Sequence, residues 1–297
     1  MCAWISRAEA LRHFATCDGP TRSQQHIKPL HWYVASRLVL EGGFLPDDIA
    51  PRPPFRVERG RRELLLHYDE TQATGEERTV LGGLKTKNVD VVIARPTIGP
   101  ALAVSCKGMT GALRNLTNRM EELIGECTNL HITYPALVFG FLFVVRANRR
   151  DESAAAEVAS GARRMAANDV AFQADGGPVA SLVRFHNALC EITGRRGIRD
   201  DVSRYEAVSL LAVEAGARAG AISPEFPTPD SPLRIERFFE TLYRRYDERF
   251  VFGAPDLKAR TARPGWSPDS PCLRDPRLSA WIAERPGIEI RLSSDLG

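Results

Sequence analysis

Short continuous apolar runs in the middle of the chain predict the strands of a β-sheet. Residues 88–94 (NVDVVIA) and 101–107 (ALAVSCK) are two such runs, and the segment between them holds two prolines and a glycine. Two apolar runs joined by a turn of this composition predict a pair of adjacent strands. Residues 136–146 (ALVFGFLFVVR) are apolar throughout, which is typical of a buried strand. A further strand is predicted at 62–69.

The rest of the pattern is mainly helical. Residues 111–127 have helical periodicity, with one apolar face formed by Leu113, Leu116, Met120, Leu123, Ile124 and Cys127. Further helices are predicted at 1–18, 23–44, 152–168, 178–194, 201–217 and 231–248. Connectors or loops are expected at 45–55, 71–83 and 253–276, and a short helix and a terminal strand (IEIRL, 288–292) close the chain.

This order of elements predicts an α/β (α+β) fold with a central mixed β-sheet flanked by helices and with extra C-terminal helices. The chain has 297 residues and no internal repeat, so we expect a single domain over 1–297. Its core is expected at about 20–150 and a helical region at about 151–250. Residues 251–297 are expected to form the loop, the short helix and the terminal strand.

The composition is that of an ordinary globular protein, with 43% hydrophobic and 26% charged residues. No apolar run approaches the roughly 20 residues of a membrane span, and charges interrupt the apolar positions of the N-terminus, unlike in a signal peptide. We therefore expect a cytoplasmic protein with no membrane partner. The six cysteines form no C-x-x-C pair, so the sequence predicts neither a zinc site nor a disulfide framework.

Positive charge is carried almost entirely by arginine, with 5 Lys against 35 Arg. The net charge of +3 is weak evidence for a polyanionic partner. Paired arginines recur along the chain at Arg61–Arg62, Arg149–Arg150, Arg163–Arg164, Arg195–Arg196 and Arg244–Arg245. Such pairs are typical of solvated surface, and contact with nucleic acid is the alternative interpretation.

One of the five lysines, Lys107, ends the apolar run at 101–107. Because side chains alternate along a strand, Ser105 and Lys107 share one face of it. In the preceding strand Asp90 lies among apolar residues, where a carboxylate is costly unless it is paired or binds a metal. If the two strands pair, Asp90 lies beside Ser105 and Lys107. Lys107 is then either a strand-end charge that reaches solvent or a catalytic ammonium.

An aspartate followed about fifteen residues later by x-x-Lys resembles the active-site motif of PD-(D/E)xK nucleases. In that motif an acid precedes the lysine by two positions, whereas this chain has Ser105. The sequence SCKGMTGALRNLTNRMEE, with Asn118 and Arg119, is similar to restriction endonucleases of the CCGG-cutting group. In that group a serine takes the acid's place and a glutamate about fourteen residues past the lysine replaces it; Glu121 is at that distance.

Helix geometry also favours Glu121 over Glu122. At about 100° per residue, Glu121 lies on the flank beside the apolar face of 111–127, and Glu122 points to solvent. The alternative is that Glu121 pairs with Arg114 or another surface charge. The resemblance covers roughly residues 85–145, with a weaker likeness at 26–48. It is incomplete: the CCGG group has a longer insertion between its aspartate and serine, and only Arg114 matches its guanine-reading R-x-D-R run.

The resemblance implies a Mg2+ site formed by Asp90 and Glu121, with the backbone carbonyl of Cys106 as a further ligand. It also implies that Lys107 orients or deprotonates the attacking water, a role unsuited to arginine, which stays protonated. Ser105 is expected to donate a hydrogen bond, since no histidine lies nearby in sequence to activate it as a nucleophile. Glu41, before Gly-Gly, is either a helix end or another acid of the site.

DNA contacts are expected from the start of the 111–127 helix and from the lysines that precede Asp90. Arginine suits guanine and asparagine suits adenine in the major groove, whereas phosphate or solvent contact is the alternative. The residues concerned are Arg114, Asn115, Asn118, Arg119, Lys85 and Lys87.

The leading functional hypothesis is a Mg2+-dependent type II restriction endonuclease that cuts double-stranded DNA at a specific, palindromic sequence and leaves 5'-phosphate and 3'-OH ends. Two-fold symmetry of such a site favours a homodimer, or a tetramer. One alternative is a modification-dependent or repair nuclease, or an RNase, of the same fold. Another is a catalytically inactive nuclease-fold module that binds nucleic acid or a protein.

Overall fold

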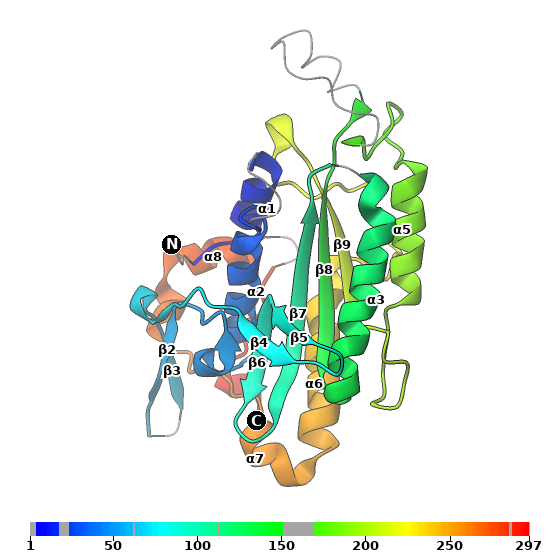
Figure 1. The fold of residues 1–297 in the computed structure, drawn as a ribbon. Helices are drawn as coiled ribbons and strands as arrows, with labels where there is room; N and C mark the ends of the chain where they lie inside the picture. Colours follow the sequence, from blue (N-terminus) through cyan, green and yellow to red (C-terminus); the bar gives the residue numbers. More distant parts are fainter. Residues whose placement is uncertain are drawn as a thin grey trace.

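The computed structural model describes residues 4–17, 24–61, 63–111, 113–150, 169–284 and 287–296. Its centre is a five-stranded sheet of order β1-β6-β7-β8-β9 (Figure 1). The strands are β1 (Ile49–Ala50), β6 (Val91–Arg95), β7 (Gly99–Met109), β8 (Val138–Arg146) and β9 (Ala207–Val213). The β1–β6 and β6–β7 pairs are antiparallel, and the β7–β8 and β8–β9 pairs are parallel. The expected mixed sheet flanked by helices is confirmed.

Helices cover both faces of this sheet (Figure 1). On one face α3 (Leu116–Thr133) and α5 (Ala180–Glu191) pack on the aromatic side chains of β8. On the other face α2 (Lys28–Leu40) and α6 (Phe238–Tyr246) pack on the alternate side chains of β7 and β8. Because both faces are covered, every residue of β8 except Arg146 is buried, which explains its uninterrupted apolar sequence.

Two small hairpins lie outside the central sheet. β2 (Phe55–Arg59) pairs with β3 (Leu64–Tyr68), which includes most of the strand expected at 62–69. β4 (Arg78–Leu81) pairs with β5 (Thr86–Val89). β4 forms within the segment expected to be a loop, because its partner β5 supplies hydrogen bonds that local sequence does not reveal.

The remaining elements surround the sheet at its edges. The helix α1 (Arg7–Thr16) begins at a capping box in which Ser6 and Glu9 bond each other's backbone N–H groups. α7 (Lys258–Thr261) and α8 (Pro276–Ala283) lie in the C-terminal part. Short 3-10 turns are found at Pro46–Asp48, Glu70–Gln72, Leu113–Asn115, Gly216–Arg218, Ile235–Arg237, Pro255–Leu257, Pro271–Arg274 and Ser293–Leu296, and a π-helical turn at Asp247–Phe252. Among the described residues, no helix is both long and apolar enough to span a membrane.

The helix predicted at 201–217 is wrong. This segment contains β9, the fifth strand, all seven residues of which are buried. A short apolar run fits a buried strand and a buried helix equally well, and only pairing with β8 decides between them.

The C-terminal segment and one of the arginine pairs differ from what the sequence predicted. The terminal strand at 288–292 is absent, and Leu292 makes only an isolated bridge with Trp266. Arg195 is not a surface residue: it is buried and forms an ion pair with buried Glu206. The helix predicted at 152–168 falls outside the described residues.

Candidate active site

Asp90 is placed by the junction of two strands. β5 ends at Val89, β6 begins at Val91, and the chain bends at Asp90 between them. Since Val91 pairs with Val104 in antiparallel register, Asp90 lies opposite Ser105. The predicted pairing of the two apolar runs therefore exists, but Asp90 lies at a bend and not in a strand interior.

Three donors converge on one oxygen of Asp90. Its Oδ2 accepts hydrogen bonds from the backbone N–H of Cys106 at 2.8 Å and from Lys107 Nζ at 2.6 Å. Ser105 Oγ donates to the same oxygen at 3.2 Å. Burial opposes ionisation of Asp90, but the charges of Lys107 and His31 and these hydrogen bonds together lower its pKa. Asp90 is therefore a carboxylate at neutral pH.

Lys107 is half-enclosed and charged. Burial favours its neutral form, but Asp90 and Glu126 outweigh burial and raise the pKa of Lys107. A lysine with a raised pKa donates hydrogen bonds and stabilises negative charge, and it is a poor proton acceptor at neutral pH. The electrostatics of this site therefore favour charge stabilisation by Lys107 over proton abstraction.

Glu126 of α3 is the helix carboxyl that reaches this cluster. It is buried, and its Oε2 lies 3.3 Å from Ser105 Oγ. Its Oε1 has no hydrogen-bond partner among the described residues and lies 3.6 Å from Lys87 Nζ. Burial raises the pKa of Glu126 despite the opposing charges of Lys107 and Lys87. A protonated Glu126 can donate to Ser105, which in turn donates to Asp90.

Glu121, the acid expected here from the sequence, has a different position. It is exposed and lines a cavity of about 270 Å³ that also reaches Lys107 and Glu126. Glu122 is exposed too, and its carboxylate lies 2.5 Å from Arg119. The sequence did contain a signal for Glu126, because it is spaced three and four residues from Leu123 and Leu130, which are buried.

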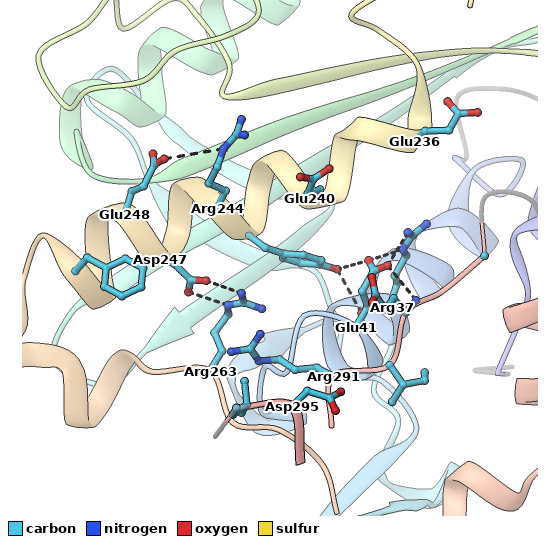
Figure 2. A pocket seen from close by; sticks show the side chains of 16 residues that line it. Arg37, Glu41, Glu236, Glu240, Arg244, Asp247, Glu248, Arg263, Arg291 and Asp295 are labelled. Atoms are coloured by element: carbon cyan, nitrogen blue, oxygen red, sulfur yellow. Dashed lines mark hydrogen bonds and ion pairs between the residues drawn. The ribbon is translucent and has the colours of Figure 1, made fainter. Parts of the chain in front are cut away.

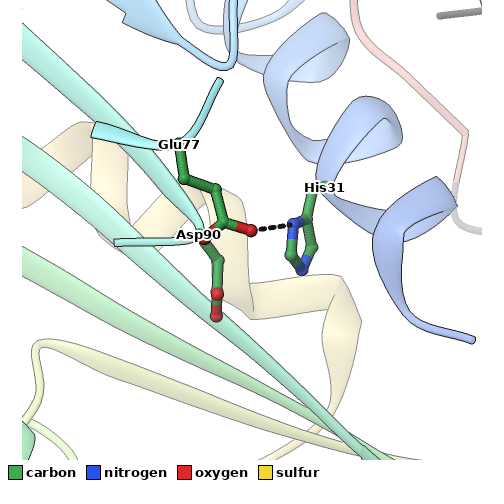
Figure 3. A group of neighbouring side chains, drawn as sticks. All are labelled: His31, Glu77 and Asp90. Carbon is green, nitrogen blue, oxygen red and sulfur yellow. Dashed lines mark ion pairs between the residues drawn. The ribbon is translucent and has the colours of Figure 1, made fainter. Parts of the chain in front are cut away.

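A second group of ligand-type side chains meets Asp90 from the other direction. His31 comes from α2 and Glu77 from the segment before β4 (Figure 3). One ligand atom from each of His31, Glu77 and Asp90 lies within 4.8 Å of the others. The backbone of Cys106, whose carbonyl is the other expected ligand, lies close enough to His31 to raise the pKa of the imidazole, against the larger effect of burial.

The imidazole of His31 is in a protonation state that suits metal binding. This ring is buried, and its Nε2 has no hydrogen-bond partner among the described residues. Burial lowers the pKa of His31 to about 4, so the ring is neutral near pH 7 and has a lone pair available. Burial and the charge of Asp90 raise the pKa of Glu77. Neither His31 nor Glu77 was predicted, because no spacing in the sequence links them.

The residues expected to contact DNA lie around the 270 Å³ cavity and the start of α3. Lys85, Lys87 and Arg119 line the cavity. Asn115 and Asn118 are exposed. The side chain of Arg114 falls outside the described part of the chain.

A larger cavity, of about 800 Å³, lies beside α2 and α6 (Figure 2). Glu41 lines it, bound by Arg37 at 2.7 and 2.8 Å and by the Tyr243 hydroxyl at 3.0 Å. Arg263 in the same cavity pairs with Asp247. Glu41 therefore belongs to this ion-pair network, and among the described residues it is not part of the ligand-type group that includes Asp90.

Comparison of this chain with protein-family models, with curated proteins and with solved structures finds no match.

Proposed function

We propose that this protein is a divalent-metal-dependent endonuclease that hydrolyses phosphodiester bonds of double-stranded DNA. The observation that supports this most is the position of Asp90. One of its oxygens binds Lys107, Ser105 and the Cys106 amide, and its carboxylate also belongs to a metal-type group with His31 and Glu77. A metal ligand hydrogen-bonded to a lysine ammonium is suited to phosphoryl chemistry.

His31, Glu77, Asp90 and the Cys106 carbonyl are the groups that would hold the ion. Two carboxylates and a carbonyl are hard oxygen donors suited to Mg2+, and the neutral imidazole also suits Mn2+ and other transition ions. The unpartnered Nε2 of buried His31 is the structural feature that fits such an ion. A bound divalent ion lowers the pKa of a water ligand and offsets charge on a phosphate oxygen.

The protein's own groups would then act on the phosphate and on the position of Asp90. Lys107, charged at neutral pH, would donate to a phosphate oxygen or to the attacking water. Ser105 and Glu126 would orient Asp90 through the hydroxyl that lies between the two carboxyls. In this assignment Glu126 is the α3 carboxyl of the site and supports Asp90 through Ser105, whereas the sequence resemblance gives Glu121 the role of a Mg2+ ligand.

The finer proposal is a type II restriction endonuclease that acts as a homodimer, or a tetramer, on a palindromic site. It derives from the resemblance of SCKGMTGALRNLTNRMEE to the CCGG-cutting group. A dimer would place two copies of the site on the two strands.

Supercoiled plasmid incubated with the protein and Mg2+ or Mn2+ tests the proposal, and EDTA is the control. Discrete linear fragments with a common end sequence, 5'-phosphate and 3'-OH, are the expected result. Lys107→Ala should abolish cutting, whereas Lys258→Ala, which changes an exposed lysine of α7, should not.

The second candidate is a catalytically inactive DNA-binding module. The replacement of the motif acid by Ser105 favours it. Tight plasmid binding without cutting in either metal would support this candidate and contradict the first. Smeared products, or cutting of modified DNA alone, would instead indicate a nuclease of the same chemistry with another target.

A further inference from the structure

The tip of the β4–β5 hairpin presents large apolar side chains to solvent. Leu84 is 76% exposed, more than any other described large hydrophobic residue, and Leu81 is 62% exposed. Ile132 of α3, beside the tip, is 51% exposed. Exposed apolar groups that are gathered at one place are typical of a binding surface.

This tip is held rigidly against α3 (Figure 1). Asn129 Oδ1 accepts from the backbone N–H of Leu84 at 2.7 Å and of Lys85 at 3.0 Å, and its Nδ2 donates to the Lys85 carbonyl at 2.9 Å. The Gly83 N–H also donates to the Asn129 backbone carbonyl at 2.8 Å. Four hydrogen bonds therefore fix the conformation in which Leu84 points away from the protein.

The two glycines of the tip permit this close packing. A Cβ added to Gly82 would lie 2.1 Å from Asn129 Nδ2, and one added to Gly83 would lie 2.4 Å from Ile132. A larger residue at either position would force the side chain of Asn129 or Ile132, or the hairpin itself, to move. The exposure of Leu84 is thus built into the fold and is not the result of a loosely held loop.

The tip borders the cavity that leads to the candidate active site. Leu84, Lys85, Lys87 and Lys107 all line this 270 Å³ cavity, so it contains three of the chain's five lysines. The cavity is lined by four cationic residues, these three lysines and Arg119, and by three carboxylates, of which Glu126 lies beside Lys87 and Glu122 beside Arg119. Glu121 is its remaining carboxylate. Concentrated lysines around an exposed leucine complement a polyanion that also has apolar faces.

We propose that the β4–β5 tip is a nucleic-acid contact in which Leu84 packs against the bases as an apolar wedge. Lys85 would hold an adjacent phosphate. The choice of DNA as partner rests on the proposed function, and the continuity of the cavity from Leu84 to Lys107 supports it. A wedge at this position would bend or unstack DNA next to the phosphate that meets Lys107.

Binding measured without hydrolysis separates this proposal from the nuclease proposal. The probes are a fluorescein-labelled mixed-sequence 30-base-pair duplex for affinity and the same duplex with 2-aminopurine for unstacking, both with Ca2+ in place of Mg2+. The wild type should raise 2-aminopurine fluorescence. Leu84→Ala should weaken binding about tenfold and abolish that rise without changing the salt dependence.

Lys85→Ala should instead change the salt dependence, because it removes one phosphate contact. The slope of log affinity against log salt should become smaller in magnitude by about 0.9. Leu296→Ala, at another exposed leucine, is the matched control and should bind like the wild type. The proposal is overturned if the wild type does not bind either duplex, or if Leu84→Ala keeps wild-type affinity and fluorescence. It is equally overturned if Leu84→Ala dissociates a dimer in sedimentation while DNA affinity is unchanged. Loss of cleavage with these binding effects intact would contradict only the nuclease proposal.

Discussion

The ammonium of Lys107 lies 2.6 Å from Oδ2 of Asp90, across an antiparallel strand pair. The pKa of Lys107 is raised and that of Asp90 is lowered, so both groups are charged at neutral pH. Asp90 is also the member shared by the Ser105–Glu126 side of the site and the His31–Glu77 side. Changes at either side should therefore act through Asp90.

Glu126→Gln should lower the cleavage rate about 10-fold to 100-fold, because it acts on Asp90 through Ser105 and does not touch the phosphate. Glu121→Gln and Glu122→Gln change exposed residues of the same helix and should stay near the wild-type rate. Initial rates of plasmid linearisation in Mg2+ and Mn2+ provide the measurement. A Glu121→Gln protein that loses activity while Glu126→Gln keeps it would restore the assignment made from the sequence.

Lys107→Arg should lower cleavage about 100-fold although the positive charge is kept. The guanidinium fork would engage both oxygens of Asp90 and so compete with the His31–Glu77 group for this carboxylate. Lys258→Arg is the matched control. A Lys107→Arg protein that cuts at the wild-type rate would show that a point charge at this position is sufficient.

Mn2+ should stabilise the protein against heat. At a concentration of about 100 times Kd it contributes roughly 2.7 kcal/mol, which raises Tm by about 5 °C. Asp90→Asn and His31→Gln should lose this shift, whereas His13→Gln, at an exposed histidine, should retain it. Scanning calorimetry with and without EDTA measures the shift independently of activity. An equal shift in all four proteins would place the ion elsewhere.

Without metal, stability should fall as the pH drops from about 6.5 towards 4. The pKa of His31 is lowered to about 4 by burial, so in this interval the unfolded chain binds a proton that the folded protein does not. The loss reaches roughly 3 kcal/mol at the acid end. Urea unfolding at pH 7 and pH 5 should show a smaller pH dependence for His31→Gln than for His13→Gln. The same slope in both variants would contradict the assignment to His31.

Local sequence alone was sufficient for the first half of the site. Two apolar runs joined by a Pro- and Gly-containing turn predicted the β6–β7 pair, and the alternation of side chains placed Ser105 beside Lys107. The register then brought Asp90 to the same point, because the two runs are adjacent in the chain. The helices at α2, α3 and α5 and the strand β8 also followed from periodicity and continuous burial.

The other residues of the candidate site, Glu126, His31 and Glu77, are brought to Asp90 by tertiary packing. The apolar face of α3 was expected to include Ile124, but Ile124 is 39% exposed. The face of α3 that is buried instead includes Glu126. His31 and Glu77 reach Asp90 from a helix and a connecting segment whose distance from it is set only by how α2 and the β4–β5 hairpin pack on the sheet. Residues 207–213 form a strand, β9, because they pair with β8. The sequence thus determined contacts between adjacent strands, and the tertiary structure decided those made by elements that meet only when the core forms, because no local period encodes their relative positions.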